Sequence, residues 1–402
     1  MSVLRLLPPT ATPIPVRAIA AAIAADQRSL MKFKRALTNN YRVVDCHLAA
    51  SARFALYILV RTLHETRTDS EREQIIIPAY TCPSVVAAIV AARMRPIFCE
   101  INPSTLAFDE RSLSSHLGRK TLAVICVHQF GIPHRLDTIA EQIRNAGAYL
   151  VEDAAQAMGS TVHGQAAGTV GDFGLFSFGP GKPLALAGGG AITVNSNVAR
   201  DQISQVWAGI TEGTRMRSLF SAFRYAALGL ITQPLSWRLV HVNGPTQAAA
   251  SAADDLGERL GMVPSQAAAG SLLLADLDGY NSDRRQTALR LKGILSEHKW
   301  VTIPETPQSS PDDAKPMIPI YLRLPVIVAD EQRKRQLVAK LWRAGIHPGT
   351  MYGRSLDDVY PRYSTHENPA ACHVASNLIT LPTHHHVGHE DVEKIEQVFR
   401  SV

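Results

Sequence analysis

The sequence predicts an α/β protein built on a mostly parallel β-sheet between helices, with a second, smaller domain. Short apolar runs of strand length alternate with longer helical segments, which is the pattern of βαβ units. Several of these runs end in polar side chains, as buried parallel strands do at the carboxyl edge of a sheet. The chain has 402 residues, enough for two domains with sizeable cores.

Three divisions of the chain are expected. An N-terminal arm and helix precedes a large ligand-binding α/β domain and a small α+β domain, at 1–40, 41–280 and 281–402. Prolines make residues 1–16 an extended arm, which we expect to lie on a neighbouring subunit, and residues 17–37 are predicted to form one helix. The large domain includes a divergent apolar and basic segment at 212–257, with a loop at 245–257.

Apolar periodicity predicts the remaining elements. We expect helices at 54–63, 85–92, 136–146, 280–298, 331–344 and 390–399, a long helix beginning near 262, and strands at 75–77, 95–100, 122–127, 149–151, 173–178, 321–324 and 378–382. The strands of the first half therefore alternate with helices, as a parallel sheet requires.

Composition is that of a globular protein, with 46% hydrophobic and 19% charged residues. The net charge of +6 does not argue for nucleic acid, and it suits an anionic substrate such as a sugar nucleotide. The five cysteines lack CxxC spacing and most lie in apolar runs, which indicates reduced thiols and a cytoplasmic location. Prolines interrupt the apolar N-terminus, so we expect no signal peptide.

The most informative stretch runs from Tyr149 to Ile192. Its first apolar run ends in Glu152 and Asp153, and its second leads to a glycine-flanked turn that exposes Lys182. A strand-end carboxylate paired with a lone lysine suggests pyridoxal phosphate chemistry. The lysine would form a Schiff base with the cofactor aldehyde, and the aspartate would keep the pyridine nitrogen protonated.

Two neighbours of Asp153 fit the same interpretation. Ala155 is small enough to lie flat against a cofactor ring, and Gln156 is placed to reach a ring substituent. Taken singly, Asp153 and Lys182 would be an ordinary strand-end acid and a surface lysine. Their combination favours the cofactor site.

The same stretch resembles the DegT/DnrJ/EryC1/StrS family of pyridoxal-phosphate-dependent sugar aminotransferases. The family pattern E-D-A-A-Q, G-D, F-S-F-x-x-x-K and G-G-A corresponds to residues 152–156, 171–172, 176–182 and 189–191. The resemblance implies a fold-type-I transferase with the cofactor held on Lys182 and Asp153. It also implies a homodimer with shared active sites.

Further cofactor contacts are implied by position. Ser177 matches the phosphate-binding serine of F-S-F, and Ser51, Ala52 and Arg53 occupy the phosphate-binding S-G-T segment of the family. Ser51 is also a predicted N-cap, and helix N-termini attract phosphate. His128 matches the family's V-H-x-x-G at a strand end.

Other positions depart from the family pattern. Cys82 stands where the family has an aromatic residue that stacks on the ring, so either Tyr80 supplies the stacking or the ring is held less tightly. Tyr352 is the retained residue of the family's substrate segment. Arg259 lies near the register of residues that reach the neighbouring subunit's cofactor phosphate.

The resemblance implies amino transfer from an amino acid, usually glutamate, to a keto sugar that is commonly nucleotide-linked, in polysaccharide or secondary-metabolite biosynthesis. Lys182 would serve as general base once displaced. Histidine replaces this lysine in related sugar dehydratases, so its presence favours an aminotransferase. Lyase or dehydratase chemistry starts from the same Schiff base, and the departures at Ala52, Cys82 and Met351 leave a non-catalytic or regulatory homologue as the other alternative.

An apolar basic segment and a histidine cluster lie outside the motifs described above. For 215–242 we favour helices that pack on the body or a dimer interface, over a basic amphipathic helix at a membrane surface. His384, His385, His386 and His389 have no acidic or cysteine partner at ligand spacing, so no metal site is expected.

Overall fold

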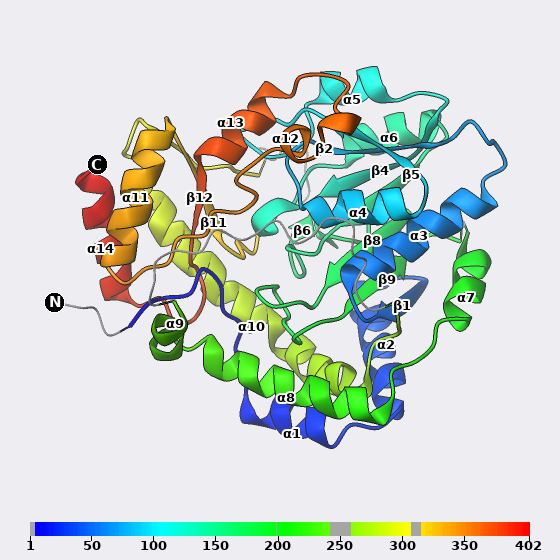
Figure 1. Cartoon of the computed structure of the whole chain (residues 1–402), viewed down its shortest axis with the longest axis horizontal. Coiled ribbons are helices and arrows are strands. Elements are labelled where there is room, and N and C mark those ends of the chain that lie inside the picture. Colours follow the sequence, from blue (N-terminus) through cyan, green and yellow to red (C-terminus); the bar gives the residue numbers. More distant parts are fainter. Residues whose placement is uncertain (1–4, 198, 242–258, 307–314) are drawn as a thin grey trace.

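A seven-stranded sheet with the order β1-β9-β8-β5-β4-β2-β3 forms the centre of the molecule (Figure 1). The computed structural model describes residues 5–197, 199–241, 259–306 and 315–402. The strands of this sheet are β1 Asp45–Ala49, β2 Gln74–Pro78, β3 Arg95–Cys99, β4 Thr121–Val127, β5 Tyr149–Asp153, β8 Phe173–Ser177 and β9 Gly190–Val194. β9 pairs antiparallel with β1 and β8, and the other pairs are parallel, which confirms the predicted fold class.

Helices cover both faces of this sheet because its strands are apolar on both sides. In β2, Ile75 and Ile77 pack with α3 and α4, whereas Ile76 between them packs with α5 and α6 on the opposite face. The helices of these layers are α2 Arg28–Tyr41, α3 Ala52–Thr66, α4 Pro83–Ala91, α5 Glu110–His116, α6 Asp137–Asn145 and α7 Arg200–Ala208. A hairpin, β6 Thr161–Val162 and β7 Gln165–Ala166, and the 3-10 turn η1 Gln129–Gly131 lie between β4 and β8 in sequence.

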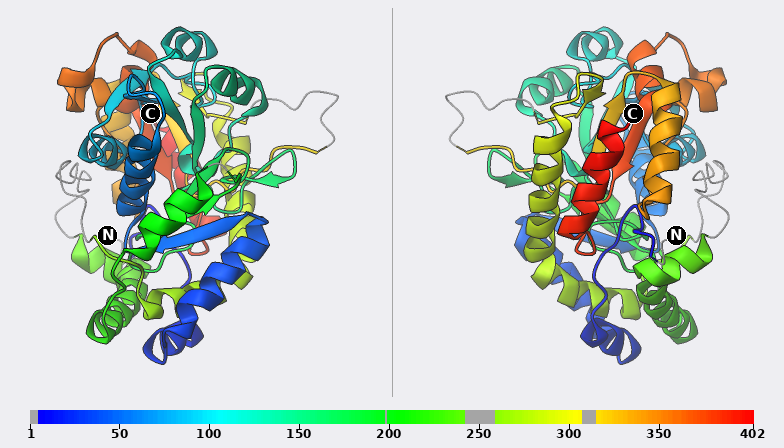
Figure 2. Two further views of the ribbon diagram at one scale, coloured as in Figure 1. Left: turned by 90° about the vertical axis from the view of Figure 1, so that its right-hand side faces the viewer. Right: turned by 90° about the vertical axis from the view of Figure 1, so that its left-hand side faces the viewer.

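The C-terminal part forms a second, smaller layer. Its antiparallel sheet has the order β10-β11-β12. Figure 2 shows α10, α11 and α14 side by side over it. The elements are α10 Pro264–Leu295, β10 Val301–Thr302, β11 Leu324–Val328, α11 Glu331–Arg343, α12 Leu356–Val359, η2 Pro361–Tyr363, α13 Pro369–Asn377, β12 Leu378–Leu381 and α14 His389–Arg400.

α10 joins the two parts as one continuous helix, where the sequence suggested two. Its first half, up to Leu277, packs with α1, α2 and α8, and its second half, from Ala288, packs with the small sheet. The stretch of α10 between Leu277 and Ala288, where its packing partners change, contains the domain boundary predicted at 280/281. The predicted strand at 321–324 is also corrected, because β11 begins only at Leu324 and Tyr321 has a φ of 47°.

The N-terminal region differs from prediction in two ways. The single helix expected at 17–37 is divided into α1 Val16–Ile23 and α2, since Ala24 ends α1 and a turn at 24–27 separates them. The described part of the arm lies on its own chain. Leu7 pairs with Ile346, and its amide donates to the Gly345 carbonyl at 2.8 Å. Leu6 and Leu7 are fully buried there.

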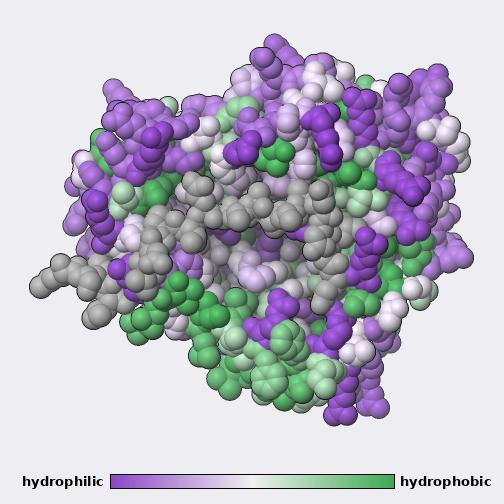
Figure 3. Space-filling model, in the orientation of Figure 1, coloured by the Kyte–Doolittle hydropathy of each residue, from purple (hydrophilic) through white to green (hydrophobic). Residues whose placement is uncertain are grey.

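The segment at 215–242 contains α8 Arg215–Ile231 and α9 Pro234–Val240. Its small and polar positions, such as Ala222 and Gly229, pack α8 on α1 and α10, as favoured from the sequence. The outer face stays apolar and exposed, and it forms the lower part of the surface in Figure 3. Its exposed side chains are Met216, Leu219, Phe220, Phe223, Leu230, Ile231, Leu235, Leu239 and Val240. Among the described helices, none has the length and apolarity needed to cross a bilayer. The loop expected at 245–257 lies outside the described residues.

Candidate active site

Lys182 and Asp153 meet at the carboxyl edge of the large sheet. Asp153 is the last residue of β5 and is 5% exposed, and Lys182 lies in the turn after β8. The turn is closed by a hydrogen bond from the Lys182 amide to the Gly179 carbonyl at 3.3 Å. Gly181 adopts a φ of 73°, a conformation that favours glycine. The Thr12 hydroxyl donates to the Lys182 carbonyl at 2.8 Å and anchors the turn from the N-terminal arm.

Burial shifts both of these ionisable groups toward neutrality. It lowers the pKa of the Lys182 amine, and negative charge at Cys82 and Asp153 only partly opposes this effect. Burial likewise raises the pKa of Asp153, against the hydrogen bond from the Ala155 amide and the positive charge of Lys182. A larger fraction of the lysine is therefore the free amine at neutral pH, which is the form that a nucleophile or general base requires.

Asp153 keeps one carboxylate oxygen available. Its Oδ1 accepts the Ala155 amide at 3.0 Å, and within the described residues Oδ2 has no hydrogen-bond donor. Ala155 is only partly buried, so its small side chain faces accessible space. A protonated ring nitrogen fits this free oxygen, and a flat ring fits the small neighbour.

Ser51 and Ser177 flank the same pair of glycines. Ser51 bridges to Gly189, and Ser177 pairs with Gly190 in the β8–β9 ladder. A Cβ added at Gly190 would lie 2.4 Å from the Ala52 amide nitrogen, so glycine is required for this close approach. Ser51 caps α3 by accepting the Phe54 amide at 3.1 Å, as predicted. Ser51, Ala52 and Arg53 thus bring the first turn of α3 beside Ser177, in a cradle suited to a phosphate.

A buried amide network links the ends of three strands. Gln156 Nε2 donates to Gln129 Oε1 at 2.9 Å, and Gln129 Nε2 donates to the Tyr80 carbonyl at 3.1 Å. Gln156 Oε1 is buried without a hydrogen-bond partner in the described structure. Such an orphaned acceptor is costly unless a ligand satisfies it, so Gln156 remains a candidate for a ring substituent.

His128 is a supporting residue in this structure. Its Nδ1 accepts the His134 amide at 3.0 Å, so its Nε2 carries the proton and donates to Glu152 Oε2 at 3.0 Å. Both ring nitrogens are used, and only the ring face remains for a cofactor. Glu152 is fully buried and also accepts the amides of Gly168, Val170 and Gly171, which holds the loop before β8 in place.

Tyr80 and Tyr352 are brought together from distant parts of the chain. Their rings pack edge to face with centroids 5.6 Å apart. The Tyr80 hydroxyl donates to the Met351 carbonyl at 2.9 Å, and the Tyr352 hydroxyl accepts from Gln156 Nε2 at 3.3 Å. Cys82 is close enough to influence the pKa values of both Lys182 and Tyr352, which places it beside them. The Tyr80 ring therefore packs on the Tyr352 ring. Stacking of Tyr80 on the cofactor ring stays a prediction.

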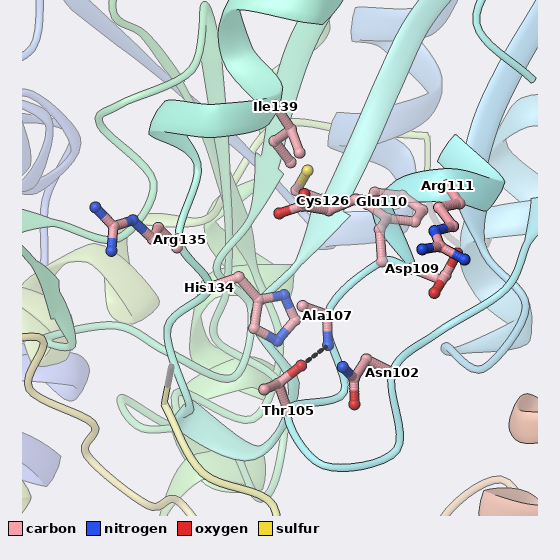
Figure 4. Close-up of a pocket in the computed structure, with 11 residues that line it drawn as sticks. Asn102, Thr105, Ala107, Asp109, Glu110, Arg111, Cys126, His134, Arg135 and Ile139 are labelled. Atoms are coloured by element: carbon pink, nitrogen blue, oxygen red, sulfur yellow. Dashed lines mark hydrogen bonds between the residues drawn. The ribbon is translucent and has the colours of Figure 1, made fainter. Parts of the chain in front are cut away.

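Arg259 does not join these residues within one chain. It lines a separate surface pocket with Tyr57, Arg61 and His64. Its predicted role concerned a neighbouring subunit, so that role stays a prediction. Another pocket, shown in Figure 4, lies between the β3–α5 connection and α6, and the lining residues do not include the predicted site.

Sequence reasoning missed several residues of the site. Arg323, just before β11, influences the pKa values of Lys182, Tyr80 and Tyr352 and therefore lies among them. Arg284 of α10 donates to the Thr12 hydroxyl at 3.1 Å and the Pro183 carbonyl at 3.3 Å, next to the lysine turn. Both are charged residues near apolar runs, and no spacing rule connects them with Lys182.

His384 has a structural role. One of its ring nitrogens, Nε2, lies 2.8 Å from the Pro8 carbonyl and holds the N-terminal arm. Among the described residues no cluster of histidine, cysteine, aspartate or glutamate has the arrangement of a metal site.

The mostly parallel seven-stranded sheet, with a desolvated lysine and a buried aspartate at its carboxyl edge and a close glycine–helix contact beside them, defines a pyridoxal-phosphate-dependent transferase fold. The chain belongs to the DegT/DnrJ/EryC1/StrS aminotransferase family, whose model matches residues 23–400. The family depends on pyridoxal phosphate. The free Asp153 oxygen and the orphaned Gln156 Oε1 fit that cofactor.

Named relatives include the GDP-perosamine synthase of Vibrio cholerae, 30% identical over 50% of this chain and 51% of its own length. The dTDP-4-dehydro-2,3,6-trideoxy-D-glucose 4-aminotransferase of Saccharopolyspora spinosa is 28% identical over 64% of this chain and 60% of its own. The chain thus spans about half to three fifths of these relatives' lengths.

Solved structures show the same fold. The Helicobacter pylori aminotransferase PseC, involved in the biosynthesis of pseudoaminic acid, superposes with a TM-score of 0.75 at 17% identity, covering 100% of both chains. A DegT/DnrJ/EryC1/StrS aminotransferase from Brucella abortus superposes with a TM-score of 0.72 at 22% identity, covering 96% of this chain and 95% of its own.

Proposed function

We propose that this protein is a pyridoxal-phosphate-dependent aminotransferase that moves an amino group from an amino acid, glutamate being the expected donor, to a nucleotide-linked keto sugar. The observation that carries the proposal is the desolvated Lys182 amine beside the buried Asp153 carboxyl group, next to the close backbone contact between Gly190 and the first turn of α3. The names of the relatives from Vibrio cholerae and Saccharopolyspora spinosa support a nucleotide sugar as acceptor. The net charge of +6 suits such an anion.

When bound, the cofactor supplies an electron sink for the negative charge that develops at the donor's α-carbon. Lys182 Nζ would hold the cofactor, and as a free amine it would move the proton from that carbon. Its lowered pKa keeps it available as a base. Asp153, whose Oδ2 has no donor in the described structure, would hold the proton on the ring nitrogen, and Gln156 Oε1 would bind a ring substituent.

The other residues position the reactants and exclude water. Ser51, Arg53 and Ser177 receive the phosphate at the first turn of α3, where backbone amides and the helix dipole favour an anion. The packed rings of Tyr80 and Tyr352 close the site on the side of the small domain. Their burial lowers the local dielectric, which strengthens each electrostatic contact with the substrate.

The first test is the visible absorption spectrum of the purified protein reconstituted with pyridoxal phosphate, before and after glutamate is added. We expect an absorption band of lysine-linked cofactor that glutamate bleaches and that Lys182→Ala cannot form. Lys394→Ala, a partly exposed lysine of α14, serves as the matched control and should behave as wild type. Keto sugar nucleotides would then be screened as acceptors.

Each alternative has its own outcome in this experiment. A band that resists every amino donor would replace the aminotransferase with lyase-type or dehydratase chemistry. Failure to bind the cofactor even after reconstitution would overturn the enzyme proposal and favour a non-catalytic homologue.

We also infer a homodimer. The exposed apolar face of α8 and α9 is larger than scattered surface residues would give, and such patches mark interaction sites. Sedimentation of the purified protein tests this inference, and a monomer at micromolar concentration would refute it.

A further inference from the structure

Arg323 is a partly buried cation, and within the described residues no protein group accepts a hydrogen bond from its enclosed Nε. Its Nε is enclosed and has no hydrogen-bond acceptor, and across the described ranges its guanidinium forms neither a hydrogen bond nor an ion pair. Burial lowers its pKa to about 10, with the Tyr352 and Tyr80 hydroxyls opposing this shift. An enclosed donor without an acceptor is unfavourable, so the retention of this cation beside a reactive lysine calls for an anionic ligand.

Two glycines keep the guanidinium open toward the lysine turn. A Cβ added at Gly181, the residue before Lys182, would lie 3.4 Å from Arg323 Nη2. A Cβ added at Gly349 would lie 3.4 Å from Nη1. Each Nη atom of Arg323 therefore lies beside a glycine that has no side chain. One of these glycines, Gly181, belongs to the turn that carries Lys182.

The backbone before Arg323 is firmly held. The Thr383 hydroxyl lies 2.7 Å from the Tyr321 carbonyl and 3.1 Å from the Leu322 carbonyl. The Ile320 amide donates to the Gly131 carbonyl at 3.0 Å, which ties the same segment to the large domain. The arginine thus projects from a fixed position, as a ligand-binding residue should.

The cofactor phosphate is an unsuitable partner for this arginine. The cradle at Ser51, Ser177 and Gly190 already supplies amides, hydroxyls and a helix N-terminus for that phosphate. The groups that sense the charge of Arg323 are Lys182 and the tyrosine pair, which lie where the substrate must react.

We propose that Arg323 binds the α-carboxylate of the amino donor, and of the keto acid that leaves, through its guanidinium. A planar guanidinium matches a carboxylate in bidentate geometry and fixes its orientation as well as its charge. With the carboxylate held there, the donor's α-carbon lies next to Lys182. The inference rests on the proposed function, and it names the residue that selects amino acids over simple amines as donors.

The test compares wild type, Arg323→Met and Arg323→Lys, all reconstituted with pyridoxal phosphate. Binding of 2-oxoglutarate to the pyridoxal form, which cannot react with it, is measured by calorimetry. We expect Arg323→Met to weaken this binding at least tenfold and to raise the KM for glutamate by more than its kcat falls. The affinity of Arg323→Lys for 2-oxoglutarate should lie between those of wild type and Arg323→Met, because lysine keeps the positive charge but cannot bind a carboxylate in bidentate geometry. The reaction with propylamine, which has no carboxylate, should change less than threefold.

Arg354→Met is the matched control, since Arg354 is exposed and donates to the Asp358 carbonyl. It should bind 2-oxoglutarate as wild type does. Unchanged 2-oxoglutarate binding in Arg323→Met would overturn the inference, and so would a selective loss of the cofactor or of nucleoside diphosphate affinity. If wild type accepts no amino donor yet binds 2-oxoglutarate in an Arg323-dependent way, the proposed function fails and the carboxylate site stands.

Discussion

At the residue scale, the site is made of groups that are unfavourable without a ligand. Desolvation lowers the pKa of Lys182, burial raises the pKa of Asp153, and Gln156 Oε1 has no hydrogen-bond partner in the described structure. Arg323 adds an unpaired guanidinium. The folded apoprotein therefore tolerates strain that binding of cofactor and donor would relieve, which is the usual stability cost of an active site.

Gly190 provides the sharpest residue-scale prediction. Gly190→Ala places a Cβ 2.4 Å from the Ala52 amide nitrogen and forces the first turn of α3 away from Ser177. We expect the dissociation constant for pyridoxal phosphate to rise at least tenfold, because a shifted helix N-terminus no longer aims its amides at the phosphate. Fluorescence titration of the apoprotein measures this constant.

Gly179→Ala is the matched control for that substitution. Its Cβ would lie 3.8 Å from Ser177 Oγ, which is ordinary van der Waals contact. The affinity of this variant for pyridoxal phosphate should stay within threefold of wild type. Equal losses of affinity for pyridoxal phosphate in the two variants would contradict a phosphate-binding role for the first turn of α3.

The sequence predicted the local parts of the proposed site and not the distant ones. Lys182, Asp153 and Gln156 lie in one stretch whose strand ends and glycines carry a recognisable pattern. Gln129 and Arg323 enter the site only because parallel pairing and the small domain bring them there. No periodicity or spacing encodes such contacts, since they depend on the three-dimensional path of the chain.

At the element scale, apolar runs predicted most strands and helices of the large sheet, but they missed β1, α5, α7 and the connections between elements. The extent of α10 was missed because its middle is charged where it passes between two cores. The N-terminal arm was expected on a neighbour because prolines indicate an extended chain and say nothing about its partner. Its contacts with Ile346 and His384 join residues more than 330 positions apart.

The arm predicts a pH-dependent stability. Burial, with the positive charges of His386, His385 and Arg284, lowers the pKa of His384 to about 3, although the hydrogen bond to Pro8 opposes this. The pKa of His384 in the folded protein lies below its value of 6.5 in the unfolded chain. The contribution of neutral His384 to the free energy of unfolding is therefore complete above pH 6.5, and it is lost as the pH falls toward 3. One such group changes the free energy of unfolding by roughly 1.4 kcal/mol per pH unit within that window.

His384→Gln should therefore flatten the acid side of the stability curve. The amide keeps a donor for the Pro8 carbonyl and cannot titrate. Urea unfolding at a series of pH values between 7 and 4 measures how the free energy of unfolding depends on pH. The slope of this dependence gives the number of protons taken up on unfolding, and the variant should take up fewer than wild type, by up to one proton. His389→Gln, an exposed histidine at the start of α14, should leave the slope unchanged. Parallel curves for wild type and His384→Gln would refute the prediction.

At the scale of the whole molecule, the site lies between two cores that share one helix. The large sheet contributes Asp153 and Lys182, and the small domain contributes Arg323 and Tyr352. α10 packs its two halves into the two cores and fixes their relation. A ligand that contacts both parts must therefore stabilise them together.

Cofactor binding should accordingly raise the stability of both domains in one cooperative transition. At a free pyridoxal phosphate concentration 100 times its dissociation constant, the gain in free energy of unfolding is about 2.7 kcal/mol. Trp207 reports on the large domain, where its indole donates to the Leu48 carbonyl at 3.1 Å, and Trp300 reports on the small one, stacked on Phe399. Single-tryptophan variants, unfolded in urea with and without the cofactor, should show coincident midpoints that move together.

In Lys182→Ala the same cofactor concentration should give a smaller shift of the unfolding midpoint, because the covalent link is lost. A shift confined to Trp207 would mean that the small domain is not coupled to the cofactor, and the contacts assigned to Tyr352 and Arg323 would then have to be formed by the substrate alone.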